Sequence, residues 1–249
     1  MRVAAGVVVR NAMAEKLSIS QLNKLGERLR KGPLNDDDIR ALDAFRLSFA
    51  NACDEVIRAL LDLGLQPSSR PAKTTPSIMA KLNRERGRLS RMQDIAGCRV
   101  VVENVAAQDR VLADIVTRFP GAQVVDRRLT PSHGYRAVHV IVRVGELHVE
   151  IQVRTVLQHS WAAATEALSD SFGRDLKYGG GPENIRTTIV TASRVINSLE
   201  YFETVASELR EDDTQKNLAK LMDWVRETVK RELQELAERI TIPPEAEDR

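Results

Sequence analysis

The sequence is poor in the residues that build disulfide frameworks, zinc sites and membrane spans. Its 249 residues include two cysteines, and aromatic residues make up 4%. Cys53 and Cys98 are too few for a disulfide framework or a zinc site, and we expect reduced, buried thiols. No apolar run approaches the ~20 residues of a membrane span, and the run 4–9 is too short for a signal-peptide core. We therefore expect a cytoplasmic protein without a membrane partner.

An excess of charge of one sign is also lacking. Lys and Arg number 37 against 35 Asp and Glu, and this balance is too mild to indicate nucleic-acid binding by itself. Hydrophobic residues, in contrast, make up 43% of the chain, which is enough for a core. The length suits one domain with a helical extension. We predict a loosely ordered segment over 1–15, a domain over 16–182 and a C-terminal helical extension over 183–249.

The two ends of the chain have helical periodicity. Near the N-terminus, apolar residues recur every three or four positions, and a Lys-Gly-Pro sequence at 31–33 ends the first run. Asn35 is predicted to cap the second helix and Ser77 the third. Beyond the glycine-rich break at 179–182, the last helix has an apolar stripe that either packs on the body or forms an oligomer interface. The predicted helices are 17–29, 36–60, 77–89, 183–210 and 214–240.

The middle of the chain has the alternation of a sheet. Strands are predicted at 99–102 and 123–125, with a helix over 106–118 between them. Two alternating segments, 135–144 and 147–155, flank Gly145-Glu146 and predict a hairpin with a type II′ turn. We therefore predict an α+β fold with a mixed, largely antiparallel sheet flanked by helices.

A two-residue turn determines the hairpin register and places an unusual set of side chains on one face. Apolar pairs such as Val140 with Ile151 form the other face. A polar face on an antiparallel sheet is ordinarily a solvated surface, but such surfaces favour Thr, Lys and Ser. The composition here favours a functional site. The predicted pairs on this face are Arg143 with His148, Ile141 with Glu150, His139 with Gln152, and Ala137 with Arg154.

Charged residues before the first strand favour phosphate chemistry. Basic residues crowd 70–91, and at helical spacing Lys81, Arg84, Arg88 and Arg91 share one face. Arginine supplies the paired donors that a polyphosphate requires, although a solvated helix face is the ordinary alternative. Asp94 precedes a strand and is a candidate magnesium ligand or the cap of a turn.

The two carboxylates and the cationic cluster indicate a class of reaction. Asp94, Glu150 and the basic residues suit phosphoryl transfer, which depends on positioning and charge neutralisation. A base near the attacking hydroxyl completes such a site. The sequence has no His/Cys spacing typical of zinc hydrolases.

Three blocks, in this order and spacing, resemble the signature of RelA/SpoT synthetase domains. They are 94–99 (DIAGCR), 134–139 (GYRAVH) and 149–155 (VEIQVRT), and Trp161 follows as in that family. The resemblance covers roughly 70–180. It implies a sheet of the nucleotidyltransferase type and transfer of the β,γ-pyrophosphate of ATP to the ribose 3′ hydroxyl of GTP or GDP, which yields (p)ppGpp, the alarmone of the stringent response.

The resemblance also implies roles for individual residues. Asp94 would bind Mg²⁺, and Glu150 would hold the metal or activate the hydroxyl. Tyr135 would stack on the acceptor base. The implied ATP-binding residues are Arg70, Lys73, Ser77, Lys81 and Arg99, and the other acceptor-binding residues are Arg136, His139, Gln152 and Arg154.

Departures from the family pattern leave alternatives for the acceptor. The loop 130–133 (TPSH) and the Arg70–Lys73 spacing differ from common synthetases, and Ala167 follows Glu166 where a histidine is usual. A toxin that pyrophosphorylates the 3′ end of tRNA, paired with an antitoxin protein, is one alternative. An inactive nucleotide- or RNA-binding module is another. We expect a small, stand-alone synthetase, with a homo-oligomer through the C-terminal helices as a further expectation.

Overall fold

The computed structural model describes residues 17–208 and 213–241, so the predicted loose segment 1–15 lies outside it. The helices are α1 (Ile19–Lys31), α2 (Asp36–Leu47), α3 (Phe49–Asp62), α4 (Thr75–Glu85), α5 (Val105–Arg118), α6 (Val156–Phe172), α7 (Glu183–Glu208) and α8 (Asp213–Thr241), with short 3-10 helices η1 (Leu89–Arg91) and η2 (Arg174–Tyr178). The strands are β1 (Ser68–Arg70), β2 (Gly97–Val102), β3 (Gln123–Asp126), β4 (Val138–Val144) and β5 (Leu147–Thr155).

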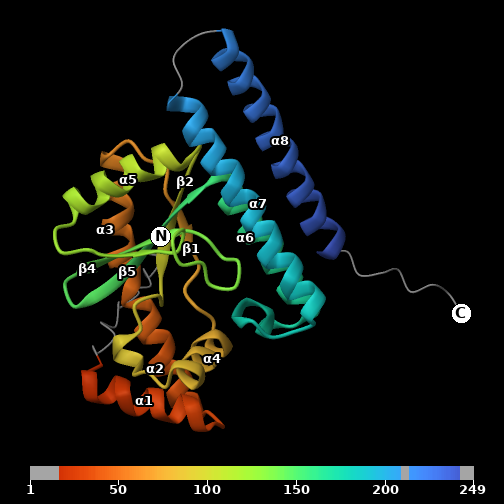
Figure 1. Cartoon of the computed structure of the whole chain (residues 1–249). Helices are drawn as coiled ribbons and strands as arrows, with labels where there is room; N and C mark the ends of the chain where they lie inside the picture. Colours follow the sequence, from red (N-terminus) through yellow and green to blue (C-terminus); the bar gives the residue numbers. More distant parts are fainter. Residues whose placement is uncertain (1–16, 209–212, 242–249) are drawn as a thin grey trace, which may run out of the picture.

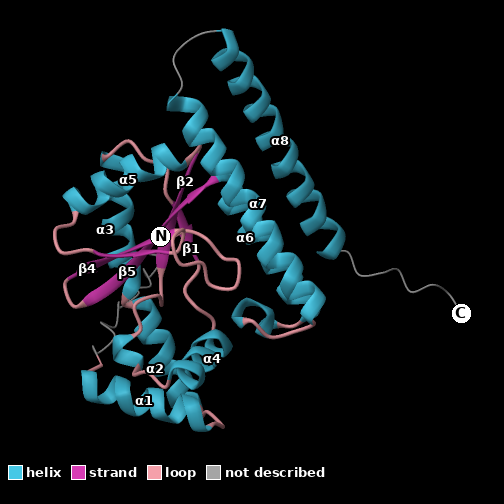
Figure 2. Cartoon of the chain, in the orientation of Figure 1, coloured by secondary structure: helices cyan, strands magenta, loops and turns pink. Residues whose placement is uncertain are grey.

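The five strands form one mixed sheet between layers of helices (Figure 2). Its strand order is β1-β2-β5-β4-β3, and only the β2–β5 pair is parallel. The predicted mixed, largely antiparallel sheet is therefore confirmed. The edge strand β1 lies between the helices predicted at 36–60 and 77–89, where no strand was predicted. Three residues with two serines are too short to show alternation.

The hairpin register is confirmed pair by pair. Val144 lies opposite Leu147, Ile141 opposite Glu150, and His139 opposite Gln152. In the turn, Gly145 has a positive φ of 59° and Glu146 does not have a positive φ, as in a type II′ turn. The paired segment is shorter than predicted at its start, because β4 begins at Val138.

The apolar face of the sheet builds the main core against α3 and α5. Val140, Ile151 and Val153 on this face are fully buried. Figure 1 shows α1, α2 and α4 gathered at one end of the molecule, while α6, α7 and α8 lie on the other side of the sheet from α3 and α5. Cys53 and Cys98 are buried free thiols in the main core, and burial is the main cause that raises the pKa of Cys98 to about 12.

The predicted helix 36–60 is two helices. Asn35 caps α2 as expected, because its side chain accepts a hydrogen bond from the Asp38 amide. The helix then breaks at Ser48, whose hydroxyl donates to the Phe45 carbonyl. A serine hydroxyl that bonds the backbone in this way competes with the helical ladder. Ile39, at helical spacing from the buried Leu42, is 44% exposed and does not join the core.

The third predicted helix starts and ends earlier than expected. Thr74, rather than Ser77, is the N-cap of α4, and its side chain accepts from the Ser77 amide. Because α4 ends at Glu85, Arg88 and Arg91 do not share a helix face with Lys81, and that prediction was wrong. The helix ends where Arg86 adopts a left-handed φ of 48° and Gly87 follows.

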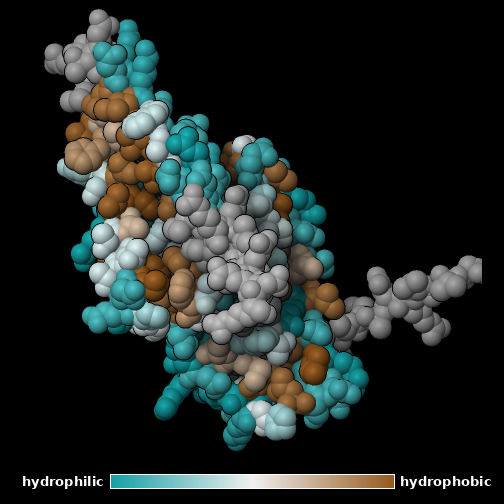
Figure 3. Space-filling model, turned by 90° about the vertical axis from the view of Figure 1, so that its right-hand side faces the viewer, coloured by the Kyte–Doolittle hydropathy of each residue, from teal (hydrophilic) through white to brown (hydrophobic). Residues whose placement is uncertain are grey.

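The two predicted C-terminal helices are present as α7 and α8, and they run antiparallel along one side of the molecule (Figure 1). On the α8 stripe, Leu233 and Val229 pack in a second apolar cluster with α6 and α7. Trp224 and Leu221 are more than half exposed. Figure 3 shows apolar surface over this end of the pair, to which Tyr201 and Phe202 of α7 contribute exposed rings. Packing on the body is thus confirmed for one half of the stripe, and the oligomer interface stays a prediction.

Within the described ranges, no helix combines the length and the apolarity that crossing a bilayer requires.

Candidate active site

The sheet places the predicted side chains in rows across its polar face. One row runs from Arg70 on β1 through Gly97 on β2 to Glu150 on β5. A Cβ at position 97 would overlap the Glu150 carbonyl oxygen, so the close approach of β2 and β5 requires glycine here. The missing side chain also lets Arg70 reach across β2, and its Nη1 lies 2.6 Å from Oε2 of Glu150.

Glu150 is the centre of a closed network. Its Oε2 accepts hydrogen bonds from Arg70 and from Gln152 Nε2 at 2.9 Å, and its Oε1 lies 2.6 Å from His139 Nδ1. Burial by itself raises the pKa of this carboxyl. The hydrogen bond from His139, the charge that His139 carries when protonated, and Arg70 lower it from 4.5 to about 2. Glu150 is therefore ionised and buried, which contradicts the interpretation of this face as solvated.

The network continues from His139 to Tyr135 and Arg154. The Tyr135 hydroxyl lies 3.0 Å from His139 Nε2 and accepts a hydrogen bond from Arg154 Nη2 at 2.8 Å. Burial raises the pKa of Tyr135, so the hydroxyl keeps its proton. With a neutral imidazole, every bond can then be donated in one direction, from Arg154 to Tyr135 to His139 to Glu150.

Asp94 has a different environment. Its Oδ2 lies 2.7 Å from Nζ of Lys81 and 3.3 Å from Nζ of Lys73, whereas its buried Oδ1 has no partner among the described residues. The Lys73 backbone is held on both sides, since its amide donates to the Ile95 carbonyl and its carbonyl accepts from Arg46 Nε. These contacts of Asp94 contradict the turn-capping interpretation. Lys73 and Lys81, two of the residues predicted to bind ATP, lie beside it.

Both carboxylates line the same cavity, which has a volume of about 540 Å³. Asp94 and Lys81 line it on one side, and His139 and Glu150 line it from the sheet. Arginines around the lining add positive charge: Arg86, Arg88, Arg91 and Arg127. A cavity of this size suits a ligand held by a few convergent polar groups.

A second set of nitrogen-bearing side chains lies beside this network. Within the part of the chain that the structure describes, Arg99, Arg154 and His159 each have a buried ring or guanidinium nitrogen without a partner. Burial, and then the charges of Arg154 and Arg70, lower the pKa of Arg99. Burial and the same kind of repulsion from Arg99 and Arg154 lower the pKa of His159. Unpartnered buried donors next to like charges favour an anionic ligand. Sequence reasoning missed His159, and its position five residues after Arg154, in the first turn of α6, was the only signal.

Two predicted residues lie apart from the others. Arg136 points to α7, where its guanidinium contacts Ser193 and Asn197. Ser77 sits in the first turn of α4, and its hydroxyl accepts from Thr74 at 2.9 Å. The structure therefore brings together Arg70, Lys73, Lys81, Asp94, Arg99, Tyr135, His139, Glu150, Gln152 and Arg154.

The two candidate metal ligands differ in their fit to a cation. Among the described residues, no group of three or more His, Cys, Asp or Glu side chains forms a metal cage. Magnesium needs only one or two carboxylates when phosphates supply the other oxygens. The free Oδ1 of Asp94 fits this role. Both oxygens of Glu150 already accept hydrogen bonds from protein donors, so Glu150 fits it less well.

Known proteins are similar to this chain in sequence and in fold. The family described as "Region found in RelA / SpoT proteins" matches residues 70–169. An uncharacterized protein of Mycobacterium tuberculosis is 39% identical over 125 residues, which are 49% of this chain and 46% of that protein. The chain thus spans about half the length of this mycobacterial relative. The GTP pyrophosphokinase YjbM of Bacillus subtilis is 30% identical over 155 residues, which are 56% of this chain and 71% of that protein.

A solved structure has the same fold. The crystal structure of small alarmone synthetase 1 from Bacillus subtilis bound to its product pppGpp has a TM-score of 0.53 and 23% identity, and the match covers 68% of this chain and 98% of that one. The predicted fold class is confirmed by this likeness. The family segment 70–169 contains all ten residues that the structure brings together. Because the Bacillus pyrophosphokinase is also covered over most of its length, the chain belongs to the RelA/SpoT family.

Proposed function

We propose that the protein transfers the β,γ-pyrophosphate of ATP to the 3′ hydroxyl of GTP or GDP. The observation that carries the proposal is the cavity lined by Asp94, Lys81, His139 and Glu150. Phosphoryl transfer requires cations on the donor and a polar group at the attacking hydroxyl, and this cavity has both. The pyrophosphokinase relative and the product-bound synthetase support the choice of reaction.

The donor phosphates would lie between Asp94 and the arginines of β1 and β2. Lys73 and Lys81 now neutralise Oδ2 of Asp94, and phosphate oxygens would take over part of that pairing. A magnesium ion fits Oδ1 of Asp94, and when bound it would offset phosphate charge. Arg70 and Arg99 are fixed on neighbouring strands and supply guanidinium donors to the same ligand.

On the acceptor side, the 3′ oxygen attacks the β-phosphorus, the bond from that phosphorus to the α–β bridging oxygen breaks, and AMP leaves. The hydroxyl proton passes to the Glu150–His139 pair. A carboxylate with a pKa of about 2 is a weak base. Donor phosphates compete with Glu150 for Arg70. Transfer of Arg70 to them would leave Oε2 with the Gln152 amide as its donor and would raise the pKa of Glu150. Donor binding would in this way prepare Glu150 for the acceptor.

The tRNA 3′ end is a second candidate acceptor, and one observation favours it. Arg86, Arg88 and Arg91 are exposed at the cavity, and no ion pair among the described residues involves them. A row of free arginines would suit the repeated phosphates of a nucleic acid. A toxin of this kind would also call for a neutralising antitoxin partner.

Transfer of label from γ-labelled ATP tests the proposal. The protein is incubated with Mg²⁺ and, separately, with GTP, GDP, AMP and bulk tRNA, and Glu150→Gln serves as the inactive control. Label in a guanine nucleotide supports the main proposal. Label in tRNA alone replaces it with the second candidate, and label in neither contradicts both.

A further inference from the structure

Helix α7 lies outside the family segment 70–169, yet it contacts the loop 127–137 between β3 and β4. This loop, called the acceptor loop below, carries Tyr135, which is predicted to stack on the acceptor base. Arg136 Nε donates to Ser193 Oγ at 3.0 Å, and Arg136 Nη1 lies 2.9 Å from Asn197 Oδ1. The same Nη1 donates to the Arg128 carbonyl at 2.6 Å. The guanidinium of Arg136, near the end of the loop, therefore connects the loop both to Arg128 at its start and to α7.

The loop has a second contact with α7 at Gly134. Its φ is 86°, and a Cβ there would stand 2.9 Å from Cγ2 of Ile189. Trp161 Nε1 donates to the Gly134 carbonyl at 3.0 Å from the opposite helix, α6. The residue just before Tyr135 is thus held between α6 and α7, with no room for a side chain.

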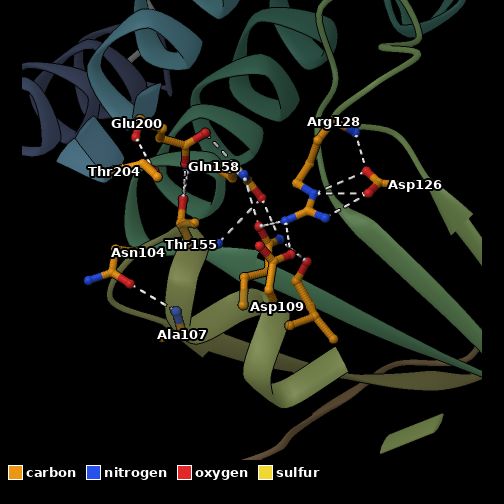
Figure 4. A network of polar contacts seen from close by, with 11 residues as sticks. Asn104, Ala107, Asp109, Asp126, Arg128, Thr155, Gln158, Glu200 and Thr204 are labelled. Carbon is orange, nitrogen blue, oxygen red and sulfur yellow. Dashed lines mark hydrogen bonds and ion pairs between the residues drawn. The ribbon is translucent and has the colours of Figure 1, made fainter. Parts of the chain in front are cut away.

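A buried polar network fixes α7 to the sheet. Glu200 of α7 accepts hydrogen bonds from Thr155, the last residue of β5, and from Gln158 (Figure 4). Gln158 continues to Gln108 of α5, which also accepts from Arg128. Figure 4 shows Arg128 bound in turn to Asp126 at the end of β3. Because the Arg128 carbonyl also accepts a hydrogen bond from Arg136, the network reaches the acceptor loop.

Tyr135 and Arg136 are neighbours whose side chains go to different places. Tyr135 reaches into the active site, where it bonds His139 and Arg154, while Arg136 reaches out to α7. The two anchors leave the backbone between them little freedom to rotate. A shift of Arg136 would turn the Tyr135 ring out of its position.

We propose that Arg136 is a positioning residue, through which α7 holds the Tyr135 ring in the orientation that receives the acceptor base. The identity of the ligand as a nucleotide acceptor rests on the proposed function. Arg136 itself does not touch the acceptor. The C-terminal helices, rather than the family motifs alone, then control how well the acceptor binds, and the donor side at Asp94 is independent of them.

The test compares variants on both sides of the contact. Arg136→Gln removes the charged fork, Arg136→Lys keeps one charged donor, and the double variant Ser193→Ala/Asn197→Ala removes only the partners on α7. Ser198→Ala is the matched control, because its exposed hydroxyl bonds only within α7. For each protein we would measure the KM for acceptor and for ATP, the binding of fluorescent mant-GDP, the hydrogen exchange of 130–137 and the melting temperature.

We expect Arg136→Gln to raise the acceptor KM about tenfold, the loss of one or two charge-assisted hydrogen bonds. The KM for ATP should change less than about twofold, because the donor side at Asp94 does not depend on α7. A general loss of structure would instead change both KM values. Arg136→Lys and the double variant should fall between wild type and Arg136→Gln, and exchange of 130–137 should speed up in the same order. Equal changes in both KM values, or unchanged exchange, would overturn the proposal.

Failure of the proposed function would look different. If the wild-type protein transfers label to no acceptor, the exchange and mant-GDP measurements still decide the inference. Faster exchange of 130–137 together with weaker mant-GDP binding supports the positioning role. Unchanged exchange or unchanged mant-GDP binding refutes it.

Discussion

Asp94 and Glu150 line one cavity, but the fold prepares these two carboxylates in opposite ways. Glu150 has all its oxygen atoms engaged by Arg70, Gln152 and His139. Asp94 is paired through one oxygen, and its other oxygen is buried with no partner in the described ranges. A buried polar atom without a partner is costly unless a ligand completes it. The comparison teaches that the Asp94 side of the cavity leaves a carboxylate oxygen for a ligand, whereas the Glu150 side is complete in advance; in the proposed reaction these are the donor side and the acceptor side.

The largest effect should come from the open carboxylate. We expect Asp94→Asn to lower the transfer rate by at least about 10³-fold, because an amide cannot offset phosphate charge as a carboxylate with its cation does. Circular dichroism and the melting temperature should show a folded protein, since no other described group depends on Oδ1. Asp114→Asn, an exposed aspartate on α5, is the control. A folded Asp94→Asn protein with normal turnover would break the comparison at its donor end.

The closed carboxylate should have the next largest effect. Glu150→Gln keeps the size of the side chain but leaves Arg70 and His139 facing a neutral amide. We expect a loss of at least about 10²-fold in rate, the contribution of a general acid–base group, with the affinity for ATP changed far less. Glu55→Gln on the surface of α3 is the control. An active Glu150→Gln protein would assign Glu150 a structural role only.

The same variant sharpens the comparison through pH. The pKa of Glu150 is lowered from 4.5 to about 2 in the folded state. Its contribution to stability is therefore present above pH 4.5 and is lost as the pH falls towards about 2. We expect the wild-type protein to lose more unfolding free energy than Glu150→Gln across this window, as measured by urea unfolding. If the unfolding free energies of the two proteins fall in parallel with pH, the network does not lower the pKa of Glu150.

Variants of Tyr135 test whether the network of Glu150, His139 and Tyr135 serves the acceptor and not ATP. Tyr135→Ala should weaken acceptor binding by the value of base stacking, about 1–3 kcal/mol, and leave ATP binding nearly unchanged. The sequence predicts a mild effect for Tyr135→Phe. Because the Tyr135 hydroxyl contacts His139 and Arg154, we expect the turnover of Tyr135→Phe to fall while its acceptor KM stays close to normal. Tyr201→Ala, at an exposed ring of α7, is the control; an equal loss of ATP affinity would contradict the assignment.

The smallest effect concerns Glu200, a buried carboxylate that has hydroxyl and amide donors but, among the described residues, no cation in contact. Burial raises its pKa, and Thr155 and Gln158 oppose this only in part. Its contribution to stability is therefore greatest below pH 4.5 and is lost as the pH rises through its folded pKa. We expect Glu200→Gln to melt slightly above wild type at about pH 8 and to match it at about pH 4. The reverse order would show that Glu200 has a cationic partner.

Local patterns predicted the parts of the fold that depend on neighbours along the chain. The two-residue turn at Gly145-Glu146 was sufficient for the β4–β5 register, because side-chain period and turn geometry leave one solution. That register alone was enough to place Glu150 beside His139 and Gln152. The same local reasoning failed at the ends of α4 and at Ser48, where single backbone conformations decide and apolar spacing does not.

The sequence by itself thus determined the family motifs, the hairpin and the identity of the two carboxylates, since these follow from short-range patterns. Only the tertiary structure decided that Arg70 crosses β2 to reach Glu150, because the contact joins positions 80 residues apart and depends on the absence of a side chain at Gly97. It also decided that Arg136 contacts Ser193 on α7 and not the network around Glu150. Neighbouring residues of one block can point to opposite sides of the chain, and only packing against distant helices determines which side is the active site.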